Sequence, residues 1–211
     1  MADKEVQKIQ FFSRDTNKLY QLYGEPPTLK ISGVPMHRHI KMTPLQDTQT
    51  KIDALRPKGI VLDTCMGLGY TSIFSARRKE VEKVMVFEKD HNVVEIAQLN
   101  PYSKEFFENP KIGLVEGDVF EKVKELPTAH FDSVMHDPPT FSLATELYSQ
   151  KFHHEIHRIM KNNARLWHYC PDPGKLSGKS KLSDKIIMNL KQTGFRNIRY
   201  DAKSCGILAE K

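Results

Sequence analysis

The segment VLDTCMGLGYTS, Val61 to Ser72, carries the clearest structural signal in this chain of 211 residues. An apolar run from Val61 leads into a turn that contains Gly67 and Gly69, and an amphipathic segment follows. This order predicts a buried strand, a glycine turn and a helix, the arrangement with which many α/β proteins bind nucleotides. Asp63 ends the expected strand, so a carboxylate lies beside the turn.

Short apolar runs alternate with amphipathic segments from Gly59 onward, a pattern typical of β-α units around a parallel sheet. The expected strands cover residues 59–64, 83–89, 112–117, 131–137, 164–170, 195–201 and 206–211. The last two are joined too closely for a crossover helix and should form an antiparallel hairpin at a sheet edge. The predicted fold class is α/β: a Rossmann-like, seven-stranded, mostly parallel sheet with helices on both faces.

Two helices are expected in the C-terminal half of the chain. Apolar residues recur at helical spacing from Tyr148 to Ile159 and again from Leu182 to Leu190. Gly194 stands where the second of these helices should stop.

The first 58 residues lack the alternation of strands and helices. Residues 18–23 and 28–32 read as a small β-hairpin, with Gly-Glu-Pro-Pro as the turn. Thr43, Pro44 and Gln46 then match the start of a helix with a capping box, which should run to about Arg56. We therefore expect an N-terminal hairpin and helix extension over residues 1–58 and a ligand-binding domain over residues 59–211.

Composition sets further bounds on the class of protein. The chain has no apolar run long enough for a membrane span, its polar start lacks the apolar core of a secretory signal, and its three cysteines are not paired as C-x-x-C. A cytoplasmic protein is therefore expected. The net charge of +6 and the pI of about 9.1 favour an acidic partner such as RNA only weakly, because the lysines are scattered over expected helix surfaces.

Acidic residues end three successive strands, and they indicate which cofactor the turn binds. A carboxylate at Asp63 would repel a pyrophosphate but can hold a cation, so S-adenosylmethionine, with its ammonium and sulfonium groups, fits the turn. Glu88 lies 21 residues after Gly67, a spacing at which an acid reaches ribose hydroxyls, and Asp118 could accept a hydrogen bond from the adenine amino group. The predicted cofactor-binding residues are Asp63, Cys65, Gly67, Gly69, Glu88, Lys89, Asp118 and Val119.

The segment HDPPT, residues 136–140, is the candidate reaction site because it follows the fourth expected strand. Pro138 holds Asp137 in an extended backbone conformation, so this carboxylate is fixed where it could orient a nitrogen or oxygen acceptor and take its proton. The alternative is that the prolines only end the strand and that Asp137 caps the turn. The predicted substrate-binding residues are His136, Pro138, Phe141 and Tyr148, and no metal site is expected.

The order of VLDTCMGLGYTS, VMVFEKD, LVEGD and FDSVMHDPP resembles that of class I S-adenosylmethionine-dependent methyltransferases. Cys65 stands where that family usually has the first glycine of its loop. GVPMHRHIKMTPLQDTQTKIDAL, HDPPTFSLATELYSQKFHHEIHRIM and LWHYCPDPGK are similar to sequences of a group of small predicted methyltransferases with a spermidine-synthase-like fold. This closer resemblance spans nearly the whole chain and implies a methyltransferase, but it indicates no acceptor. The reaction site itself favours a small-molecule amine or hydroxyl compound as the acceptor.

The resemblances leave three alternatives open. Spermidine synthases, which transfer an aminopropyl group from decarboxylated S-adenosylmethionine, carry a second acid where this chain has Val134. Methyltransferases that act on exocyclic base amines resemble the HDPPT segment through a D/N-P-P-aromatic motif, in which this chain has Thr140 at the aromatic position, followed by Phe141. The DPPTFS stretch also resembles one in some ribosomal RNA base methyltransferases, but the basic residues 174–181 read more simply as a solvated loop. The third alternative is a non-catalytic subunit that binds the cofactor and serves a partner.

Several further polar residues are expected to have lesser roles. His153 and His157 have the i, i+4 spacing of a metal pair, but without matching ligands they indicate a solvated helix face. His37 and His39 indicate a surface loop. The helix before the first strand of the sheet carries Asp47, Thr48 and Lys51. This helix could close over the cofactor, or the three side chains could be exposed on its surface. The N-terminal extension could serve as a lid, a homodimer interface or both.

Overall fold

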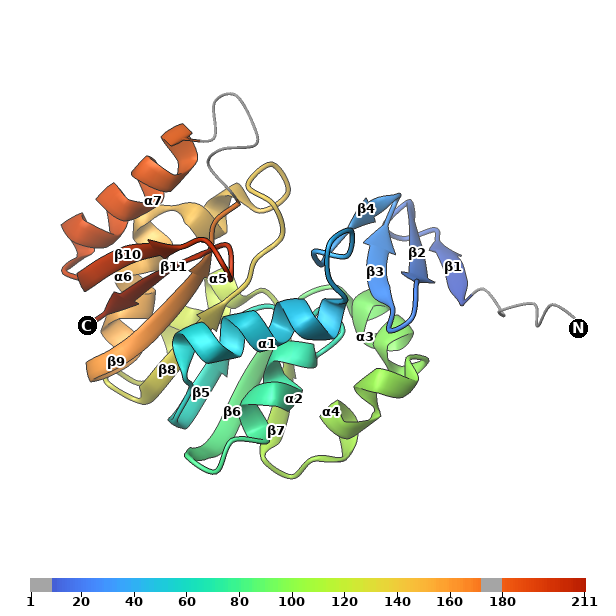
Figure 1. Cartoon of the computed structure of the whole chain (residues 1–211), viewed down its shortest axis with the longest axis horizontal. Helices are drawn as coiled ribbons and strands as arrows, with labels where there is room; N and C mark the ends of the chain where they lie inside the picture. Colours follow the sequence, from blue (N-terminus) through green and yellow to red (C-terminus); the bar gives the residue numbers. More distant parts are fainter. Residues whose placement is uncertain (1–8, 172–179) are drawn as a thin grey trace, which may run out of the picture.

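The computed structural model describes residues 9–171 and 180–211 (Figure 1). Its main sheet has seven strands in the order β10-β11-β9-β8-β5-β6-β7. The strands are β5 (Gly59–Asp63), β6 (Val81–Glu88), β7 (Ile112–Glu116), β8 (Phe131–His136), β9 (Met160–Tyr169), β10 (Arg196–Asp201) and β11 (Gly206–Glu210). Strands β5 to β9 pair in parallel, and β11 pairs antiparallel with both β9 and β10. The predicted seven-stranded, mostly parallel sheet with a C-terminal antiparallel hairpin is confirmed.

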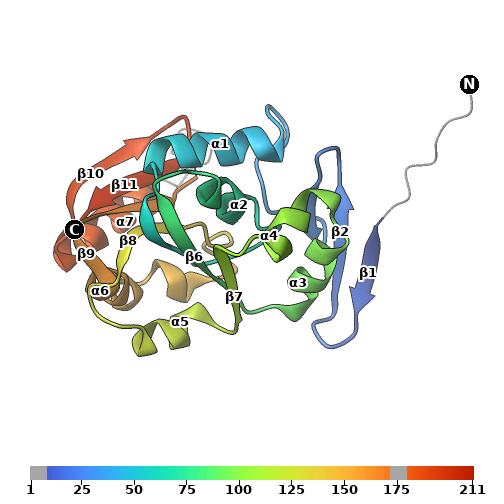
Figure 2. The ribbon, with the colours of Figure 1, turned by 90° about the horizontal axis from the view of Figure 1, so that it is seen from below.

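Helices cover both faces of this sheet, as predicted (Figure 2). The α-helices are α1 (Pro44–Leu55), α2 (Tyr70–Ala76), α3 (His91–Gln98), α4 (Lys104–Glu108), α5 (Val119–Lys122), α6 (Gln150–Ile159) and α7 (Ser180–Thr193). Three 3-10 turns are η1 (Pro101–Ser103), η2 (Val123–Glu125) and η3 (Thr145–Tyr148). Helices α1 and α2 lie on one face, and α5 and α6 lie on the other. None of the helices in the described residues has the length and apolar character needed to cross a membrane.

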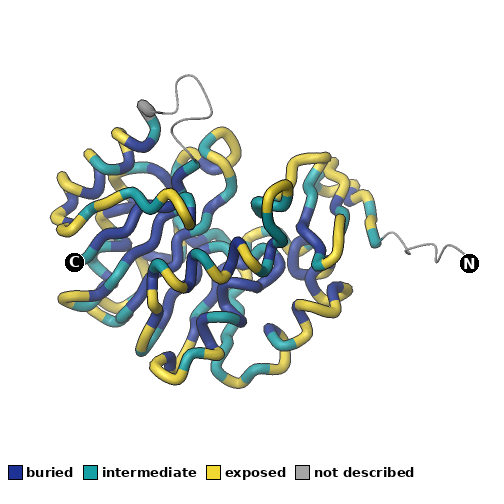
Figure 3. Tube along the Cα trace, viewed as in Figure 1, coloured by how far each residue is buried: buried dark blue, intermediate teal, exposed yellow. Residues whose placement is uncertain are grey.

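The alternation of side chains along the strands divides the core between the two faces. Val61 of β5 packs in the cluster that contains the buried residues of α2, whereas its neighbour Leu62 packs in the cluster that contains those of α6. Figure 3 shows the central strands buried along their length and the outer surfaces of the helices exposed. The continuous apolar runs therefore reflect a sheet covered on both faces.

Local signals fix the ends of two helices as predicted. The Thr43 hydroxyl accepts a hydrogen bond from the Gln46 backbone N–H at 3.2 Å, and the Gln46 side chain accepts one from the Thr43 N–H at 2.9 Å. This capping box starts α1, with Pro44 as the first helical residue. At the other end of the chain, Gly194 follows α7 with a φ of 102°, a left-handed conformation that glycine adopts readily. The expected loop over residues 174–181 lies outside the described residues as far as residue 179, and residues 180 and 181 belong to α7.

The N-terminal extension forms a second, antiparallel sheet in the order β1-β2-β3-β4. Its strands are β1 (Gln10–Ser13), β2 (Lys18–Tyr23), β3 (Thr28–Ile31) and β4 (Val34–Pro35). The predicted hairpin corresponds to β2 and β3. The prediction missed the two outer strands, β1 and β4, which extend the hairpin to a four-stranded sheet. β4 has only two residues, too few for a periodic pattern.

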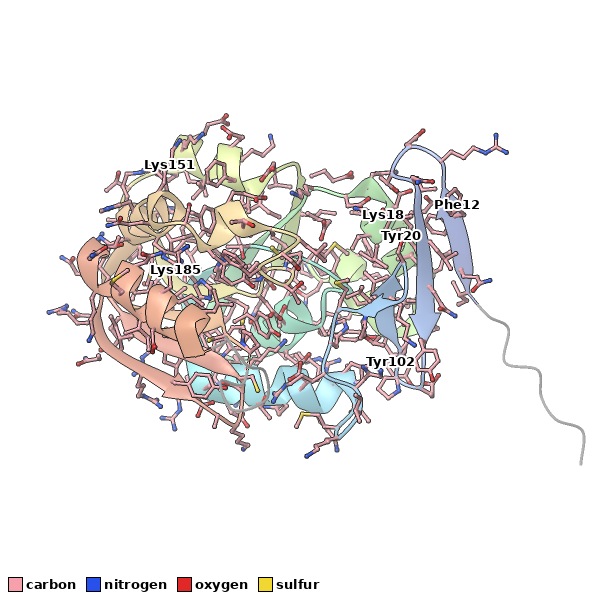
Figure 4. The ribbon with its side chains drawn as sticks, turned by 90° about the horizontal axis from the view of Figure 1, so that it is seen from above. Phe12, Lys18, Tyr20, Tyr102, Lys151 and Lys185 are labelled. Atoms are coloured by element: carbon pink, nitrogen blue, oxygen red, sulfur yellow. The ribbon has the colours of Figure 1, made fainter. Side chains whose placement is uncertain are left out.

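The small sheet packs against the ligand-binding edge of the main domain. Tyr20 is fully buried, and its hydroxyl donates a 2.6 Å hydrogen bond to Asp90, the N-cap residue of α3. Tyr70 of α2 donates a 2.9 Å hydrogen bond to the Pro27 carbonyl. Figure 4 shows Lys18 and Tyr20 on β2, with Phe12 on the outer strand β1. Tyr20 and Leu29 belong to the same hydrophobic cluster as residues of β5 and β6. The small sheet thus shares a core with the main sheet, and the predicted domain boundary at residue 58 stays a prediction.

The strand order places a ligand site at one edge of the main sheet. Chain connections run from β5 towards β6 in one direction, whereas β8 and β9 lie on the other side of β5. The carboxyl ends of β5 and β8 therefore flank the topological switch point, where open α/β sheets bind their ligands. Asp63 ends β5, and Asp137 directly follows β8 at this edge.

Replacing Tyr20 by phenylalanine should weaken the contact between the two sheets. Tyr20→Phe removes a buried hydrogen bond to a carboxylate, so the free energy of unfolding should fall by about 1–3 kcal/mol. Chemical denaturation measures this change. Tyr23→Phe on the same strand is the matched control, because the Tyr23 side chain is exposed and should contribute little. Equal losses in the two variants would contradict the proposed contact.

Candidate functional site

Two adjoining cavities lie at the switch point between the main sheet and the N-terminal sheet. The larger has a volume of about 290 Å³ and is lined by the glycine turn, the end of β6 and apolar residues of β3. The smaller, of about 110 Å³, lies against α1 and the end of β9. Asp137, Pro138 and Pro139 line both cavities. The segment predicted as the reaction site therefore separates two spaces that could hold two different molecules.

The glycine turn and Glu88 form one wall of the larger cavity. Gly67 has a φ of 54°, and its N–H donates a 3.3 Å hydrogen bond to a carboxylate oxygen of Glu88. The Asp90 N–H donates to the other oxygen at 3.0 Å. A Cβ on Gly67 would contact nothing within 4 Å, so the turn presents bare backbone to the cavity. Burial raises the pKa of Glu88 to about 7.

Asp63 lies beneath the turn rather than on the cavity surface. Its side chain is 1% exposed, and one carboxylate oxygen accepts 2.6 Å hydrogen bonds from the hydroxyls of Thr71 and Ser72 on α2. Burial raises its pKa to about 6. Its other oxygen is buried without a hydrogen-bond partner among the described residues. This geometry holds the start of α2 against the end of β5, and a direct contact with cofactor stays a prediction.

The other predicted cofactor residues divide between the cavity and its surroundings. Cys65 and Lys89 line the larger cavity together with Gly67 and Glu88. Gly69 does not line it: its φ is 74°, and a Cβ there would lie 2.5 Å from the Phe106 ring. Gly69 therefore permits close packing of the turn. The remaining two residues, Asp118 and Val119, line neither cavity. Asp118 is the N-cap residue of α5, and Val119 is buried in the core.

Asp137 forms a buried ion pair with a lysine of α1, and both residues line the smaller cavity. Lys51 of α1 places its Nζ 2.6 Å from Asp137 Oδ2 and 3.1 Å from Asp47 Oδ2. Arg38 forms an ion pair with the other oxygen of Asp47. Burial raises the pKa of Asp137, and the Lys51 ammonium acts in the opposite direction. Burial alone would lower the pKa of Lys51, but the two carboxylates outweigh it and raise the pKa above its ordinary value.

Only one of the predicted substrate-binding residues reaches a cavity. Pro138 lines both, whereas His136, Phe141 and Tyr148 lie behind the wall. The Tyr148 hydroxyl donates a 2.8 Å hydrogen bond to the Pro139 carbonyl, and the rings of Phe141 and Tyr148 are 5.4 Å apart. These side chains can support the Asp-Pro-Pro segment from the side of α6.

Two histidines occupy less exposed positions than predicted. His153 is fully buried, and its Nε2 lies 3.1 Å from Nε2 of His168. The expectation of a solvated face at His153 is therefore wrong, because this residue lies beside Phe152 on the side of α6 that faces β9. His37 is half-buried, lines both cavities and forms a 3.0 Å hydrogen bond with Thr28. Among residues 9–171 and 180–211, no group of three or more side chains is arranged to hold a metal.

Sequence reasoning missed the partners that complete the two cavities. Lys51 was placed on the correct helix, but its pairing with Asp137 joins positions 86 residues apart, and no local pattern shows it. Lys18 and Leu29 of the small sheet line the larger cavity, and Leu143 lines both. One feature of the sequence pointed to these partners. The resemblance to the small predicted methyltransferases covers both the N-terminal extension and the glycine turn, which indicated that the two segments act together.

Residues 46–169, more than half of the chain, match the methyltransferase small domain family. The chain belongs to this family. An uncharacterized protein of Methanocaldococcus jannaschii is 43% identical over 188 residues, which cover 88% of this chain and 64% of that protein. This chain thus spans less than two thirds of that relative. Polyamine aminopropyltransferase 2 of Streptomyces coelicolor is 27% identical over 96 residues, 43% of this chain and 17% of that enzyme.

Solved structures with a similar fold include both methyltransferases and spermidine synthases. A spermidine synthase in complex with the transition state analogue AdoDATO has a TM-score of 0.74 and 17% identity, and the match covers 95% of this chain and 71% of that one. An S-adenosylmethionine-dependent methyltransferase from Archaeoglobus fulgidus has a TM-score of 0.56 and 17% identity, with 74% and 69% covered. At these identities the likeness concerns the fold. It confirms the predicted Rossmann-like, spermidine-synthase-like architecture.

The larger cavity fits S-adenosylmethionine, the cofactor of this family. Its apolar lining, which includes Leu29, Ile31 and Val93, suits an adenine ring. Glu88 offers a carboxylate that is already oriented by two backbone N–H groups. The bare backbone at Gly67 permits close approach of a ligand.

The raised pKa of Glu88 predicts a pH-dependent stability for the protein without cofactor. Because its pKa is about 7 in the folded state against an ordinary value of 4.5, the folded state binds the proton more tightly, and stability should fall as pH rises between these values. Glu88→Gln should reduce this fall by about 1–3 kcal/mol, as measured by urea unfolding between about pH 5 and pH 8. Glu82→Gln, at an exposed position of β6, is the control. An unchanged pH profile in Glu88→Gln would contradict the assignment.

Proposed function

We propose that this protein is an S-adenosylmethionine-dependent methyltransferase and that it transfers the methyl group to a nitrogen or oxygen atom of a small molecule held in the smaller cavity. The observation that carries this proposal is the position of Asp137, which lines both cavities. Its Oδ2 is engaged by Lys51, and Oδ1 takes no hydrogen bond from the described residues. Asp137 thus has one oxygen held in place and one that can face an acceptor.

The cofactor roles that we propose follow the lining of the larger cavity. Glu88 accepts hydrogen bonds from the ribose hydroxyls, and the backbone at Cys65 and Gly67 borders the amino-acid portion. Asp63 acts from beneath, because its bonds to α2 hold the turn in shape. Asp118 contributes at the outer end, since Lys89, which lines the cavity, lies 3.8 Å from it. These assignments agree with nucleotide-binding α/β sheets, in which acidic residues at the carboxyl ends of strands contact the ligand.

The chemistry requires placement and the removal of one proton. When bound, S-adenosylmethionine supplies an electrophilic methyl group on a sulfonium sulfur, which keeps the bonding electron pair and leaves as a neutral thioether. Asp137 orients the acceptor through Oδ1 and takes the proton that the nitrogen or oxygen loses as its new bond to carbon forms. Pro138 and Pro139 stiffen the backbone that follows Asp137. Most of the rate gain should come from this alignment.

The size and walls of the smaller cavity support a small acceptor over RNA. Its volume of about 110 Å³ is enclosed by the segment that follows β4, by α1 and by the Asp-Pro-Pro segment. Val34, Met36 and Leu143 give it apolar walls. An RNA base would have to leave its stack and enter between the two sheets. RNA is therefore the weaker proposal for the partner.

Aminopropyl transfer is the second candidate function. It is favoured by the likeness to spermidine synthase, whose match covers 95% of this chain and thus extends over the N-terminal sheet. Against it, the position of the second acid in those enzymes is taken by Val134, which is fully buried in β8. Release of methylthioadenosine from decarboxylated S-adenosylmethionine and putrescine would favour this candidate, whereas release of S-adenosylhomocysteine from the carboxylated donor favours methyl transfer.

Asp137→Asn should separate acceptor chemistry from cofactor binding. The amide keeps the shape of the side chain but is a far weaker base, so turnover should fall by about 100-fold or more. We would measure S-adenosylhomocysteine release with a panel of amines, phenols, hydroxy acids and total RNA, and titrate S-adenosylhomocysteine calorimetrically. Asp53→Asn, on the exposed side of α1, is the matched control. Full turnover in Asp137→Asn on an acceptor that the wild type methylates would refute the role of Asp137.

A further inference from the structure

The smaller cavity contains two cations and two anions in one connected cluster. Lys51 lies between Asp137 at 2.6 Å and Asp47 at 3.1 Å, and Arg38 forms an ion pair with Asp47. The side chains of Asp47 and Lys51 are 0% and 5% exposed, and that of Asp137 is 19% exposed. These charges therefore interact with each other far more strongly than with solvent.

Among the residues that the structure describes, no other lining residue changes this charge balance near neutral pH. The remaining titratable residues of the smaller cavity are His37 and Tyr169. Burial, with Lys51 nearby, lowers the pKa of His37 to about 3, so this ring is neutral. Burial, with Asp137 nearby, raises the pKa of Tyr169 to about 12, so its hydroxyl keeps its proton. The described lining of the cavity therefore carries no net charge.

A neutral cavity is a poor site for an alkylammonium group. A cation that enters a buried space must find an uncompensated anion, because the loss of hydration is otherwise unfavourable. Here Lys51 and Arg38 together compensate both carboxylates, so an entering ammonium would also meet repulsion from these two cations. A neutral N–H or O–H group faces no such penalty and can donate to the free oxygen of Asp137.

We propose that Lys51 is a specificity determinant that excludes polyamines and restricts the acceptor to molecules whose reacting nitrogen or oxygen is uncharged. The apolar walls at Val34, Met36 and Leu143 fit an acceptor with an apolar body next to that group. This inference rests on the proposed function, because it identifies the smaller cavity as the acceptor site. It also gives a physical reason why a spermidine-synthase-like fold need not bind a diamine.

The test uses putrescine as the probe and varies the charge of the cluster. Isothermal titration of the wild type with putrescine, in the presence of saturating S-adenosylhomocysteine, should give no saturable binding in the millimolar range. Lys51→Met leaves one uncompensated negative charge and should bind putrescine about tenfold more tightly or better. Lys51→Arg keeps the charge and should behave as the wild type. Lys83→Met, on the exposed side of β6, controls for the loss of a lysine elsewhere.

A double variant separates the effect of charge from the effect of space. Lys51→Met combined with Asp47→Asn restores a net charge of zero while it keeps the methionine, so the gained putrescine affinity should be lost. Circular dichroism and thermal unfolding establish that each variant is folded. If Lys51→Met does not fold, the wild-type titration still decides, because saturable putrescine binding by the wild type overturns the proposal. An equal gain in the double variant would overturn it as well.

The same titrations distinguish this proposal from the proposed function. Binding of S-adenosylhomocysteine to the wild type reports on the larger cavity alone. If this ligand does not bind, the cofactor assignment fails, and the putrescine series, repeated without it, still reports the charge of the smaller cavity. If it binds and the wild type also binds putrescine, the cofactor site stands and the role of Lys51 is refuted.

Discussion

The buried ion pair between Lys51 and Asp137 is the constraint around which the functional edge of this protein is organised. Burying an ammonium group costs several kcal/mol unless it is paired, and here two carboxylates surround it. The pair joins α1, which precedes the main sheet, to the segment that follows β8. The Lys51 Nζ atom also lies over the Trp167 ring of β9, 5.4 Å from the ring centre. Displacement of α1 would leave charges buried without partners.

The two cavities depend on the same arrangement from opposite sides. The larger is formed by the glycine turn and Glu88 below and by the N-terminal sheet above, which the Tyr20 and Tyr70 hydrogen bonds hold against α3 and α2. The smaller is closed by α1 and by the chain that leads into it from β4. The N-terminal extension therefore lines both cavities. A methyl donor and its acceptor can meet only where the spaces adjoin, at Asp137 and Pro138.

Local sequence patterns predicted the main sheet, the capped start of α1 and the placement of Glu88 and Gly67 at one site. These features depend on residues close in sequence or on strand ends that parallel topology brings together. The pairing of Lys51 with Asp137 could not be predicted in this way, because it joins a helix and a strand end through tertiary packing. His153 was misjudged for another reason. The lack of matching metal ligands indicated a solvated helix face, whereas its partner His168 lies on β9, a contact that the spacing along α6 does not show.

The most direct test of this account is a crystal structure of the protein with S-adenosylhomocysteine. The account predicts the nucleoside in the larger cavity, with the ribose hydroxyls within hydrogen-bond distance of Glu88 and the sulfur facing the junction of the cavities beside Asp137. It further predicts that Lys51 keeps its contact with Asp137 in this complex. A nucleoside bound elsewhere, or a sulfur atom directed away from Asp137, would contradict the assignment of the two cavities to donor and acceptor.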